Sequence, residues 1–484
     1  MKMLFDLSKT GRSAFKFAKL DVPKKGLSDY IPERYLRKNQ ALLPEVAEPE
    51  LARHFTHLAS MNHHIDKGFY PLGSCTMKYN PKVNEHTSRL PGFSGLHPLA
   101  PVKITQGALR LMYELQGLLA EISGFDAVTL EPAAGAQGEL CANLITRAYF
   151  KERGEERTKV IIPDSAHGTN PASVTLSGFE SVTVASNADG LIDLDDLTEK
   201  LSTDIALIMI TNPNTLGLFE RDICKITEKV HRAGALAYLD GANLNALMGI
   251  VKPADMGFDL MHFNLHKTFS TPHGGGGPGS GPVGVTKELA DFLPVPVITK
   301  DADEYSLIYN RPKTIGKLHG YYGNFGVMVK AYTYIRLLGA SGLYEVSKNA
   351  ILNANYLKTL IGKYLEIPHS RHCMHEFVAS GKELKMFNNL RTADLAKRLL
   401  DYGYHSPTVY FPLIVSEALM VEPTETETAE TLDGFATAVQ RIVQEARINP
   451  EMLRKAPHTT PVGRLDEVRA IKELDVCYRP DRRT

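Results

Sequence analysis

A lysine flanked by histidines stands just before a glycine-rich run in the middle of the chain. The segment reads His262-Phe-Asn-Leu-His266-Lys267-Thr268-Phe269, and glycines recur from Gly274 to Gly284. A lysine at a strand end near a glycine-rich loop can be partly desolvated, and desolvation of an amine favours its neutral, nucleophilic form. Lys267 is therefore a candidate for a Schiff base with a carbonyl cofactor, and an exposed loop lysine is the alternative.

A carboxylate follows another apolar segment. Asp240 comes directly after Ala235–Leu239 and opens a polar turn that also contains Asn243. A buried carboxylate is costly unless a cation or a hydrogen-bond donor meets it, so Asp240 could pair with a cationic ring. An aspartate that caps the next helix is the competing interpretation.

Two further turns add an anion site and a ring. Ala136 and Gln137 lie among small residues that open a helix, where main-chain N–H groups can face a phosphate. His167 lies in a polar, glycine-flanked turn after the apolar segment Val160–Ile162. Taken singly, a tight turn that binds nothing and a structural histidine remain the alternatives.

Pyridoxal phosphate (PLP) needs the parts that these separated segments offer. Its phosphate needs an anion site, its pyridinium ring needs an anionic partner, and its aldehyde needs an amine. The histidine supplies a planar ring that could stack on the cofactor. Because four separate segments agree, the sequence predicts a PLP site more strongly than any one motif does.

Short apolar segments alternate with helical segments between residues 127 and 263. The expected strands are Ala127–Leu130, Val160–Ile162, Val182–Ala185, Ile205–Thr211, Ala235–Leu239 and Leu260–Phe263. The expected helices lie near Glu139–Phe150, Pro171–Ser177, Leu194–Leu201 and Ile223–Ala233. This alternation predicts an α/β fold whose mostly parallel sheet is covered on both faces, with right-handed crossovers. Ligands of such sheets bind beyond the carboxyl ends of the strands, where the candidate turns lie.

Changes in hydrophobic periodicity along the sequence predict three structural regions. Residues 1–100 lack steady periodicity, which predicts an extended arm with short helices that wraps a neighbour or covers a site. Residues 101–325 form the predicted large PLP-binding domain, which begins with a helix over 105–123 and a stop at Gly124. Residues 326–484 predict a smaller C-terminal α+β domain.

Composition excludes several classes of protein. The chain has 484 residues with 55 basic and 55 acidic side chains, so its net charge of zero argues against nucleic acid as a partner. Its five cysteines are widely spaced without a CxxC pair, which favours a reducing compartment over a disulfide scaffold. The apolar runs are too short to cross a membrane.

Other patterns compete for a chemical role. Gly279–Gly284 matches GxGxxG, but a Gly/Pro run precedes it and Pro282 interrupts it, so a dinucleotide site is not expected. His63-His64 and the segment 369–375 contain possible metal ligands without a matched zinc spacing, so no metal site is expected. No GxSxG elbow supports a hydrolase.

Four long motifs carry a family resemblance. They are Met61–Lys78, Asp164–Pro171, His266–His273 with the glycines that follow, and Thr459–Glu467. They resemble motifs of the glycine decarboxylase P-proteins, and the likeness runs from the arm to near the C-terminus. That family occurs as a fused chain of roughly twice this length or as two subunits. The length and the lysine resemble the second subunit of the split form, a bacterial and archaeal form, which implies a cytoplasmic location.

The resemblance implies a fold-type I PLP enzyme with a large and a small domain. The implied activity is that of glycine dehydrogenase (aminomethyl-transferring), an oxidoreductase acting on the CH–NH2 group of donors. In the glycine cleavage system, glycine loses CO2 and its aminomethyl group passes to the lipoyl arm of the H-protein. The implied partners are a companion subunit 1, with two copies of each subunit in a heterotetramer, and the lipoylated H-protein. The alternative is another fold-type I enzyme, such as an aminotransferase or a cysteine desulfurase with Cys373 as its nucleophile.

The resemblance also implies roles for single residues. Lys267 would hold PLP as a Schiff base, Asp240 would pair with the pyridine nitrogen, and His167 would stack on the ring. The turn at Ala136 and Gln137 would hold the phosphate together with His266 or Thr268. The full cofactor-binding set is Lys267, Asp240, His167, Ala136, Gln137, Asn243, His266 and Thr268. A channel for the lipoyl arm, lined by His63, His64 and the loop Gly68–Lys78, is a further hypothesis.

Overall fold

The computed structural model describes residues 2–39, 41–272, 274 and 277–477, which form two compact units. The smaller unit comprises Met1–His64 and the larger unit comprises Ile65–Thr484. His273, the last residue of the lysine motif, lies outside the described residues. The three-part division at residues 100 and 325 remains a proposal beside this division into two units.

The smaller unit has little hydrophobic core of its own. Its elements are α1 (Leu4–Leu7), η1 (Leu27–Asp29), η2 (Glu33–Tyr35) and α2 (Glu48–Ser60). None of these four elements contains a buried residue. Large apolar side chains are exposed instead, with Phe17 at 89% and Leu42 at 84%. Such a segment gains little stability by folding alone, because the apolar surface that would be buried stays in water.

The larger unit is built on a seven-stranded sheet. Its strands are β1 (Ala127–Thr129), β2 (Lys159–Pro163), β3 (Glu180–Val184), β4 (Ile205–Thr211), β5 (Leu236–Gly241), β6 (Leu260–Phe263) and β7 (Val283–Val285). They are arranged in the order β1-β7-β6-β5-β4-β2-β3. The pairs from β6 through β3 are all parallel. The predicted mostly parallel sheet is thereby confirmed.

Strand β7 was not among the expected strands. It lies inside the glycine-rich segment and pairs antiparallel with both β1 and β6. Pattern analysis fails here because a three-residue strand between Pro282 and Thr286 gives no period to detect. Its place shows that the GxGxxG match contributes backbone to the sheet. Gly284 fits there because Phe125 would lie 3.0 Å from a Cβ atom at this position.

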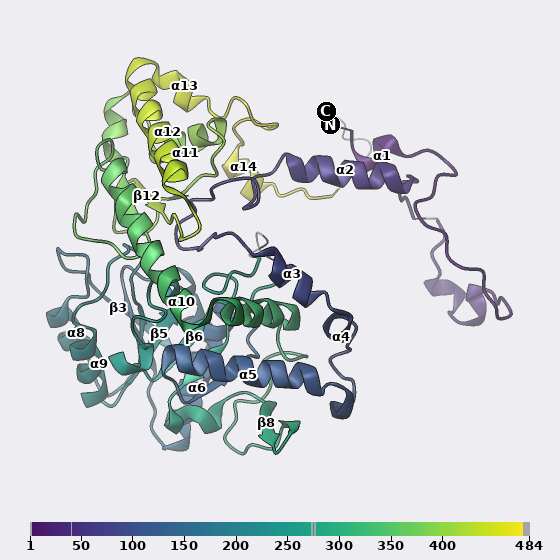
Figure 1. Ribbon diagram of the computed structural model, residues 1–484, viewed down its shortest axis with the longest axis horizontal. Coiled ribbons are helices and arrows are strands. Elements are labelled where there is room, and N and C mark those ends of the chain that lie inside the picture. The colour runs from purple at the N-terminus through teal and green to yellow at the C-terminus, as the bar shows by residue number, and fades with distance from the viewer. Residues whose placement is uncertain (1, 40, 273, 275–276, 478–484) are drawn as a thin grey trace. The chain divides into compact units, whose positions relative to one another are not determined.

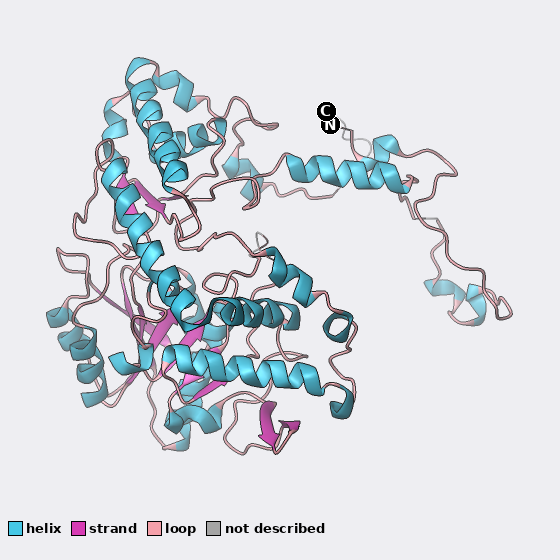
Figure 2. Ribbon diagram, in the orientation of Figure 1, coloured by secondary structure: helices cyan, strands magenta, loops and turns pink. Residues whose placement is uncertain are grey.

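Helices cover both faces of the sheet (Figure 2). Ile208 and Ile210 of β4 belong to the core that also contains α5 (Gln106–Ser123), α9 (Ile223–Arg232) and the first half of α10 (Phe325–Ile361). Leu207 and Met209 belong to the opposite core, with α6 (Gly135–Glu152) and α7 (Thr169–Leu176). Because successive strand residues point to opposite faces, the continuous apolar run of β4 fits its burial on both sides.

Further, shorter helical segments also belong to the larger unit. They are α3 (Lys82–Ser88), α4 (Pro91–Ser94), η3 (Val102–Ile104), α8 (Leu194–Lys200), η4 (Leu244–Ala246), η5 (Pro253–Met256), η6 (Lys287–Phe292) and α14 (Glu467–Lys472). A separate two-stranded sheet is formed by β8 (Val297–Asp301) and β9 (Glu304–Ile308). The helix expected over 105–123 is confirmed as α5, and Gly124 ends it with φ of 82°.

A second, smaller sheet lies in the C-terminal part. It has the order β10-β12-β11, with β10 (Phe377–Ser380), β11 (Thr408–Val409) and β12 (Ala418–Val421). Its core is shared by the second half of α10 with α11 (Thr392–Asp401), α12 (Ala429–Ile448) and α13 (Pro450–Arg454), and η7 (Lys382–Met386) lies beside it. Helix α10 changes direction at Gly339, where φ is 62°, and runs on from the large sheet into this lobe (Figure 1).

Candidate active site

A cavity of about 150 Å³ lies at the carboxyl ends of the central parallel strands. Six of the eight sequence-predicted cofactor residues line it: Ala136, His167, Asp240, Asn243, His266 and Lys267. The structure therefore brings together side chains that lie up to 131 positions apart in the sequence, as the strand-end rule for parallel sheets predicts.

Asp240 is buried at the end of β5 and is surrounded by donors. Its Oδ1 accepts from the main-chain N–H of Ala242 at 2.9 Å, and its Oδ2 accepts from Nδ2 of Asn170 at 3.1 Å. Burial opposes ionisation, but nearby His262, the N–H of Ala242, Lys267 and Asn170 outweigh it and hold the pKa of Asp240 below its usual value. The cavity therefore contains an ionised carboxylate that can face a cationic ring.

Lys267 is half-buried on the turn after β6. Its Nζ donates a hydrogen bond to the main-chain oxygen of Ser74 at 2.9 Å. Ser74 also lines the cavity and comes from the loop Gly68–Lys78. The loop that was expected to border a channel is therefore in part a wall of this cavity. His63 and His64 belong to the smaller unit, so their place in a channel remains a prediction.

His167 stands exposed at the cavity in the turn that leads into α7. The N–H of Thr169 donates to Nδ1 of His167 at 3.2 Å, so this nitrogen acts as an acceptor. Partial desolvation and the charge of Lys267 lower the pKa of His167. A neutral ring with its proton on Nε2 follows from both observations. Such a ring can lie against a planar cofactor without adding positive charge.

The turn that opens α6 forms one wall of the cavity. Ala134, at the helix start, makes no side-chain cap, so the first main-chain N–H groups of α6 are available to an anion. Gly135 lies so close to Asn264 that a Cβ atom would come within 2.8 Å of its Oδ1. Gln137 is turned into its own loop, where its Oε1 accepts from the N–H of Ala133 at 2.6 Å.

Thr268 also lies outside the cavity lining. It is fully buried behind Lys267, and its hydroxyl has no hydrogen-bond partner. The cavity itself contains two buried polar atoms in the same situation, Nδ2 of Asn264 and the hydroxyl of Thr211. Unpaired buried donors are costly, so they indicate a ligand with acceptor groups. The amine, the carboxylate, the anion-facing turn and these donors together fit PLP.

Glu139 is a cavity residue that sequence reasoning missed. It is buried on α6, where its carboxylate accepts from the hydroxyls of Thr169 at 2.8 Å and Ser173 at 2.9 Å. Burial and the neighbouring charge of Asp240 raise the pKa of Glu139 to about 7. Its position on the first turns of an ordinary helix gave no sequence signal. Through Thr169 it is linked to His167.

A buried cluster joins His375, which the sequence analysis named among possible metal ligands, to two glutamates that it missed. His375, Glu376 and Glu422 are fully buried, and their ligand atoms lie within 4.8 Å of one another. Such a group could hold a divalent cation or share protons. Burial, with the charges of Lys267 and Lys78, lowers the pKa of His375 to about 3, so this imidazole is neutral. The other members of the 369–375 segment do not belong to the cluster.

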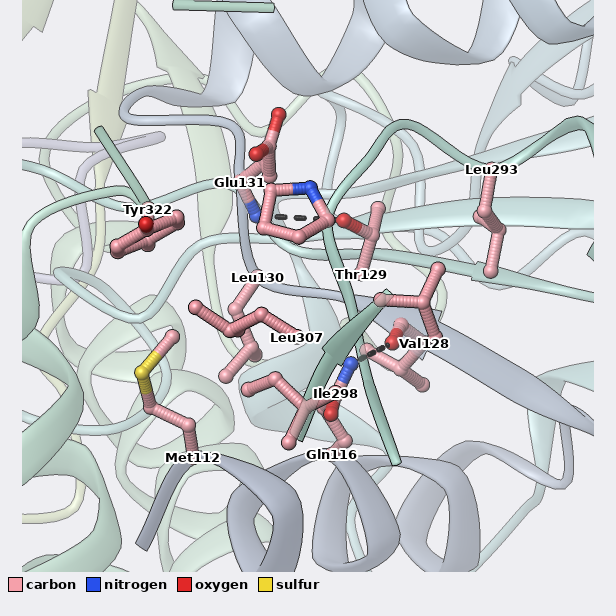
Figure 3. Close-up of a pocket in the computed structure, with 12 residues that line it drawn as sticks. Met112, Gln116, Val128, Thr129, Leu130, Glu131, Leu293, Ile298, Leu307 and Tyr322 are labelled. Carbon is pink, nitrogen blue, oxygen red and sulfur yellow. Dashed lines mark hydrogen bonds between the residues drawn. The ribbon is translucent and has the colours of Figure 1, made fainter. Parts of the chain in front are cut away.

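A second, much smaller cavity of about 20 Å³ lies between α5, β1 and the β8–β9 pair (Figure 3). Its walls are mainly apolar, with Met112 and Leu307 among them. Glu131 contributes a carboxylate to the lining, and burial raises its pKa to about 7. No lysine, histidine or cysteine is among the described residues that line this cavity. The first cavity therefore remains the candidate for the chemistry.

Comparison with known proteins identifies the family. The family described as "Glycine cleavage system P-protein" matches residues 22–307, and "Glycine dehydrogenase, C-terminal domain" matches residues 346–458. A protein of Chlorobium phaeobacteroides, "Probable glycine dehydrogenase (decarboxylating) subunit 2", is 57% identical and aligns over 98% of this chain and 99% of its own length. The chain belongs to the glycine cleavage system P-protein family. A protein of Thermotoga maritima with the same name is 58% identical over 97% of this chain and 98% of its own length.

Solved structures show the same fold. A glycine decarboxylase (P-protein) of the glycine cleavage system, in inhibitor-bound form, has a TM-score of 0.73 at 21% identity, covering 86% of this chain and 94% of its own. The cysteine desulfurase CsdA of Escherichia coli has a TM-score of 0.61 at 15% identity, covering 78% and 95%. These likenesses confirm the predicted fold-type I architecture. Among the described residues, no helix is both long and apolar enough to span a membrane.

The alternative that this member of the P-protein family is a cysteine desulfurase is not favoured. Cys373 is 3% exposed, and burial raises the pKa of its thiol to about 12. Reactive cysteines lie in exposed, electropositive surroundings that lower the thiol pKa. Cys373 is also absent from the lining of the candidate cavity. It is a core residue of the C-terminal lobe.

Proposed function

We propose that this chain binds PLP in the candidate cavity and catalyses the decarboxylation of glycine, with transfer of the aminomethyl group to the lipoyl arm of an H-protein. This is the activity of glycine dehydrogenase (aminomethyl-transferring). The observation that carries the proposal is the convergence of Lys267, Asp240 and His167 on one cavity in a member of the P-protein family.

The roles of the cavity residues follow from their surroundings. PLP, when bound, supplies an electron sink for the electrons of the bond that breaks in glycine. Lys267 offers the amine that condenses with an aldehyde, and the Ser74 carbonyl holds that amine at 2.9 Å when it is free. Asp240, kept ionised by its donors, stabilises a proton on a ring nitrogen, and each pKa unit of this effect is worth about 1.4 kcal/mol.

The other predicted residues would orient the cofactor. His167 presents a neutral ring face, and the main-chain N–H groups at Gly135 and Ala136 would face the phosphate. His266 and Asn243 line the cavity on the sides of the lysine turn and the aspartate turn. Gln137 and Thr268 would not contact the cofactor. They would fix the turn before α6 and the turn that contains Lys267.

The proposed assembly contains a companion subunit 1, with two copies of each chain, and the lipoylated H-protein as the acceptor. The similar proteins are named as subunit 2 of their enzyme, which supports a companion chain. The exposed apolar side chains of residues 15–43 support it too, because a large apolar surface is stabilised when a partner covers it. The proposed location is the cytoplasm.

Exchange of labelled bicarbonate into glycine tests the proposal. The assay contains this chain, its companion subunit, PLP and lipoylated H-protein. We expect exchange with the native chain and none with Lys267→Ala, whereas Lys225→Ala, which removes an exposed lysine of α9, leaves the rate unchanged. Borohydride reduction followed by peptide mapping should place the cofactor on Lys267. A complete mixture that consumes cysteine but never glycine contradicts the proposal.

A further inference from the structure

The turn that receives the Lys267 amine has an unusual main-chain conformation. Ser74 and Thr76 both have positive φ, 67° and 47°. Residues with a Cβ atom rarely adopt this conformation, because the side chain crowds the main chain. The turn must therefore be held by contacts outside itself. It is also the turn whose Ser74 oxygen accepts from Nζ of Lys267.

Two buried glutamates hold this turn by its main chain. Oε2 of Glu376 accepts from the N–H of Ser74 at 2.7 Å, and Oε2 of Glu422 accepts from the N–H of Thr76 at 2.8 Å. Both side chains are fully buried. Each hydrogen bond satisfies a main-chain N–H group with a buried carboxyl oxygen, and leaving such a group unpaired is costly.

The small C-terminal sheet places these glutamates side by side. Strands β10 and β12 are antiparallel, and Phe377 is paired with Val421. Glu376 directly precedes that pair and Glu422 directly follows it, so the two carboxylates leave the sheet at the same end. Glu376 also reaches the cavity wall, where Nδ2 of Asn243 lies 3.4 Å from its Oε1.

The residues around the turn cannot shift easily. The hydroxyl of Thr408 donates to the main-chain oxygen of Gly73 at 2.8 Å, and a Cβ atom on Gly73 would lie 2.3 Å from the Met420 side chain. On the other side, Nζ of Lys78 donates to Glu425 at 2.8 Å. The two glutamates thus act on a short stretch of chain whose ends are already fixed.

We propose that Glu376 and Glu422 are positioning residues for Lys267. Through the N–H groups of Ser74 and Thr76, they hold the Ser74 carbonyl where it receives the lysine amine whenever that amine is not joined to the cofactor. The inference rests on the proposed function of Lys267. It assigns a task to two carboxylates whose burial is costly unless hydrogen bonds compensate for it.

The electrostatics of the pair support this role. Burial raises the pKa of Glu422 to about 7, and burial and the proximity of Glu422 raise that of Glu376. The neighbouring His375 is neutral, so it does not pair with them as a cation. Each glutamate keeps an acceptor oxygen on the turn in either protonation state, because a carboxyl group retains a carbonyl oxygen. The hydrogen bonds, more than the charge, would then be the essential feature.

The test compares acceptor removal with acceptor retention in the complex of this chain with its companion subunit. Glu376→Ala and Glu422→Ala remove the acceptors, while Glu376→Gln and Glu422→Gln keep an amide oxygen. Glu220→Ala is the matched control, since Glu220 is 2% exposed and accepts from the N–H of Ile192 at 2.8 Å but does not line the cavity. The readout is the rate constant with which the cofactor-free complex condenses with PLP, followed by absorbance and confirmed by borohydride fixation to Lys267.

We expect the alanine variants to condense about 10-fold or more slowly than the native chain and the glutamine variants to stay within about threefold of it. Glu220→Ala should lower the thermal midpoint without changing the rate. Alanine variants that condense at the native rate overturn the inference. A second result would also overturn it: the glutamine variants condense as slowly as the alanine variants, and a metal chelator slows the native complex in the same way. The cluster would then bind a cation. A native chain that never condenses with PLP refutes the proposed function itself, before any glutamate is changed.

Discussion

Asp240 and His262 are direct neighbours across β5 and β6. The register of the two strands pairs them, and Oδ1 of Asp240 lies 3.6 Å from Nε2 of His262. The other ring nitrogen, Nδ1, lies 2.5 Å from the Tyr238 hydroxyl, so the imidazole is fixed from behind. Burial lowers the pKa of His262, and a neutral imidazole still offers an N–H dipole to the carboxylate. Asp240 is therefore held both in place and in its ionised form.

Asp240→Asn removes the charge and keeps the shape. We expect the rate of glycine decarboxylation to fall at least about 100-fold, because an adjacent opposite charge shifts a pKa by up to ~3 units and the ring nitrogen loses that support. Bicarbonate exchange measures the loss, and release of the cofactor into alkali measures PLP content. A variant that holds a full complement of PLP and retains native exchange would show that Asp240 does not face the ring.

Gly135→Ala tests the anion-facing turn. The new Cβ atom would lie 2.8 Å from Oδ1 and 2.9 Å from Nδ2 of Asn264, so the turn or the amide must move. We expect the PLP dissociation constant to rise at least about 10-fold, since overpacking displaces the helix start. Equilibrium dialysis of PLP gives the constant. Gly117→Ala on α5 is the control, because the new Cβ atom would meet nothing within 4 Å and alanine favours the helix. Equal PLP affinities in the two variants would contradict the placement of the phosphate.

Glu139 should make stability depend on pH. Because burial and Asp240 raise its pKa to about 7 from 4.5, the folded chain binds more protons than the unfolded chain between these values. The free energy of unfolding therefore decreases as pH rises through this window, by ~2 kcal/mol for this group. Glu139→Gln removes the effect, so its thermal midpoint relative to the native chain should rise between pH 5 and pH 7.5. The exposed Glu199→Gln should show no such trend, and parallel pH profiles for Glu139→Gln and the native chain would contradict the assignment.

The strand-end residues were predictable, and the residues that support them were not. Lys267 and Asp240 follow mainly apolar strands, and a parallel sheet brings the ends of such strands to one edge. Glu376 and Glu422 meet only because β10 pairs with β12 across the 37 residues between them, which no local period reveals. Glu139 occupies an ordinary helical position, and its role depends on how α6 packs over β5 and β6. Local sequence pattern thus predicts which side chains lie at the strand ends, but not which distant side chains surround them.

Cys373→Ala distinguishes a core cysteine from a nucleophile. The thiol is buried and its pKa is raised to about 12, so we expect glycine-dependent exchange within about twofold of native and stability lower by about 1 kcal/mol through lost packing. Sulfide release from cysteine should be absent in both proteins. Loss of exchange with unchanged thermal stability would point to a chemical role for this thiol and would revive the desulfurase alternative.

Deletion of residues 2–43 tests the role of the smaller unit. Its exposed apolar side chains include Phe15, Phe17 and Leu42, and α2 beyond them contains no buried residue. We expect the shortened chain to keep the thermal midpoint of the larger unit, because little core is lost, but to fail to co-elute with the companion subunit in size-exclusion chromatography. Triple substitution of those three side chains by serine should weaken assembly in the same way, whereas serine at Leu176, an exposed residue of α7, should not. A deleted chain that still assembles and supports bicarbonate exchange would place the companion interface on the larger unit.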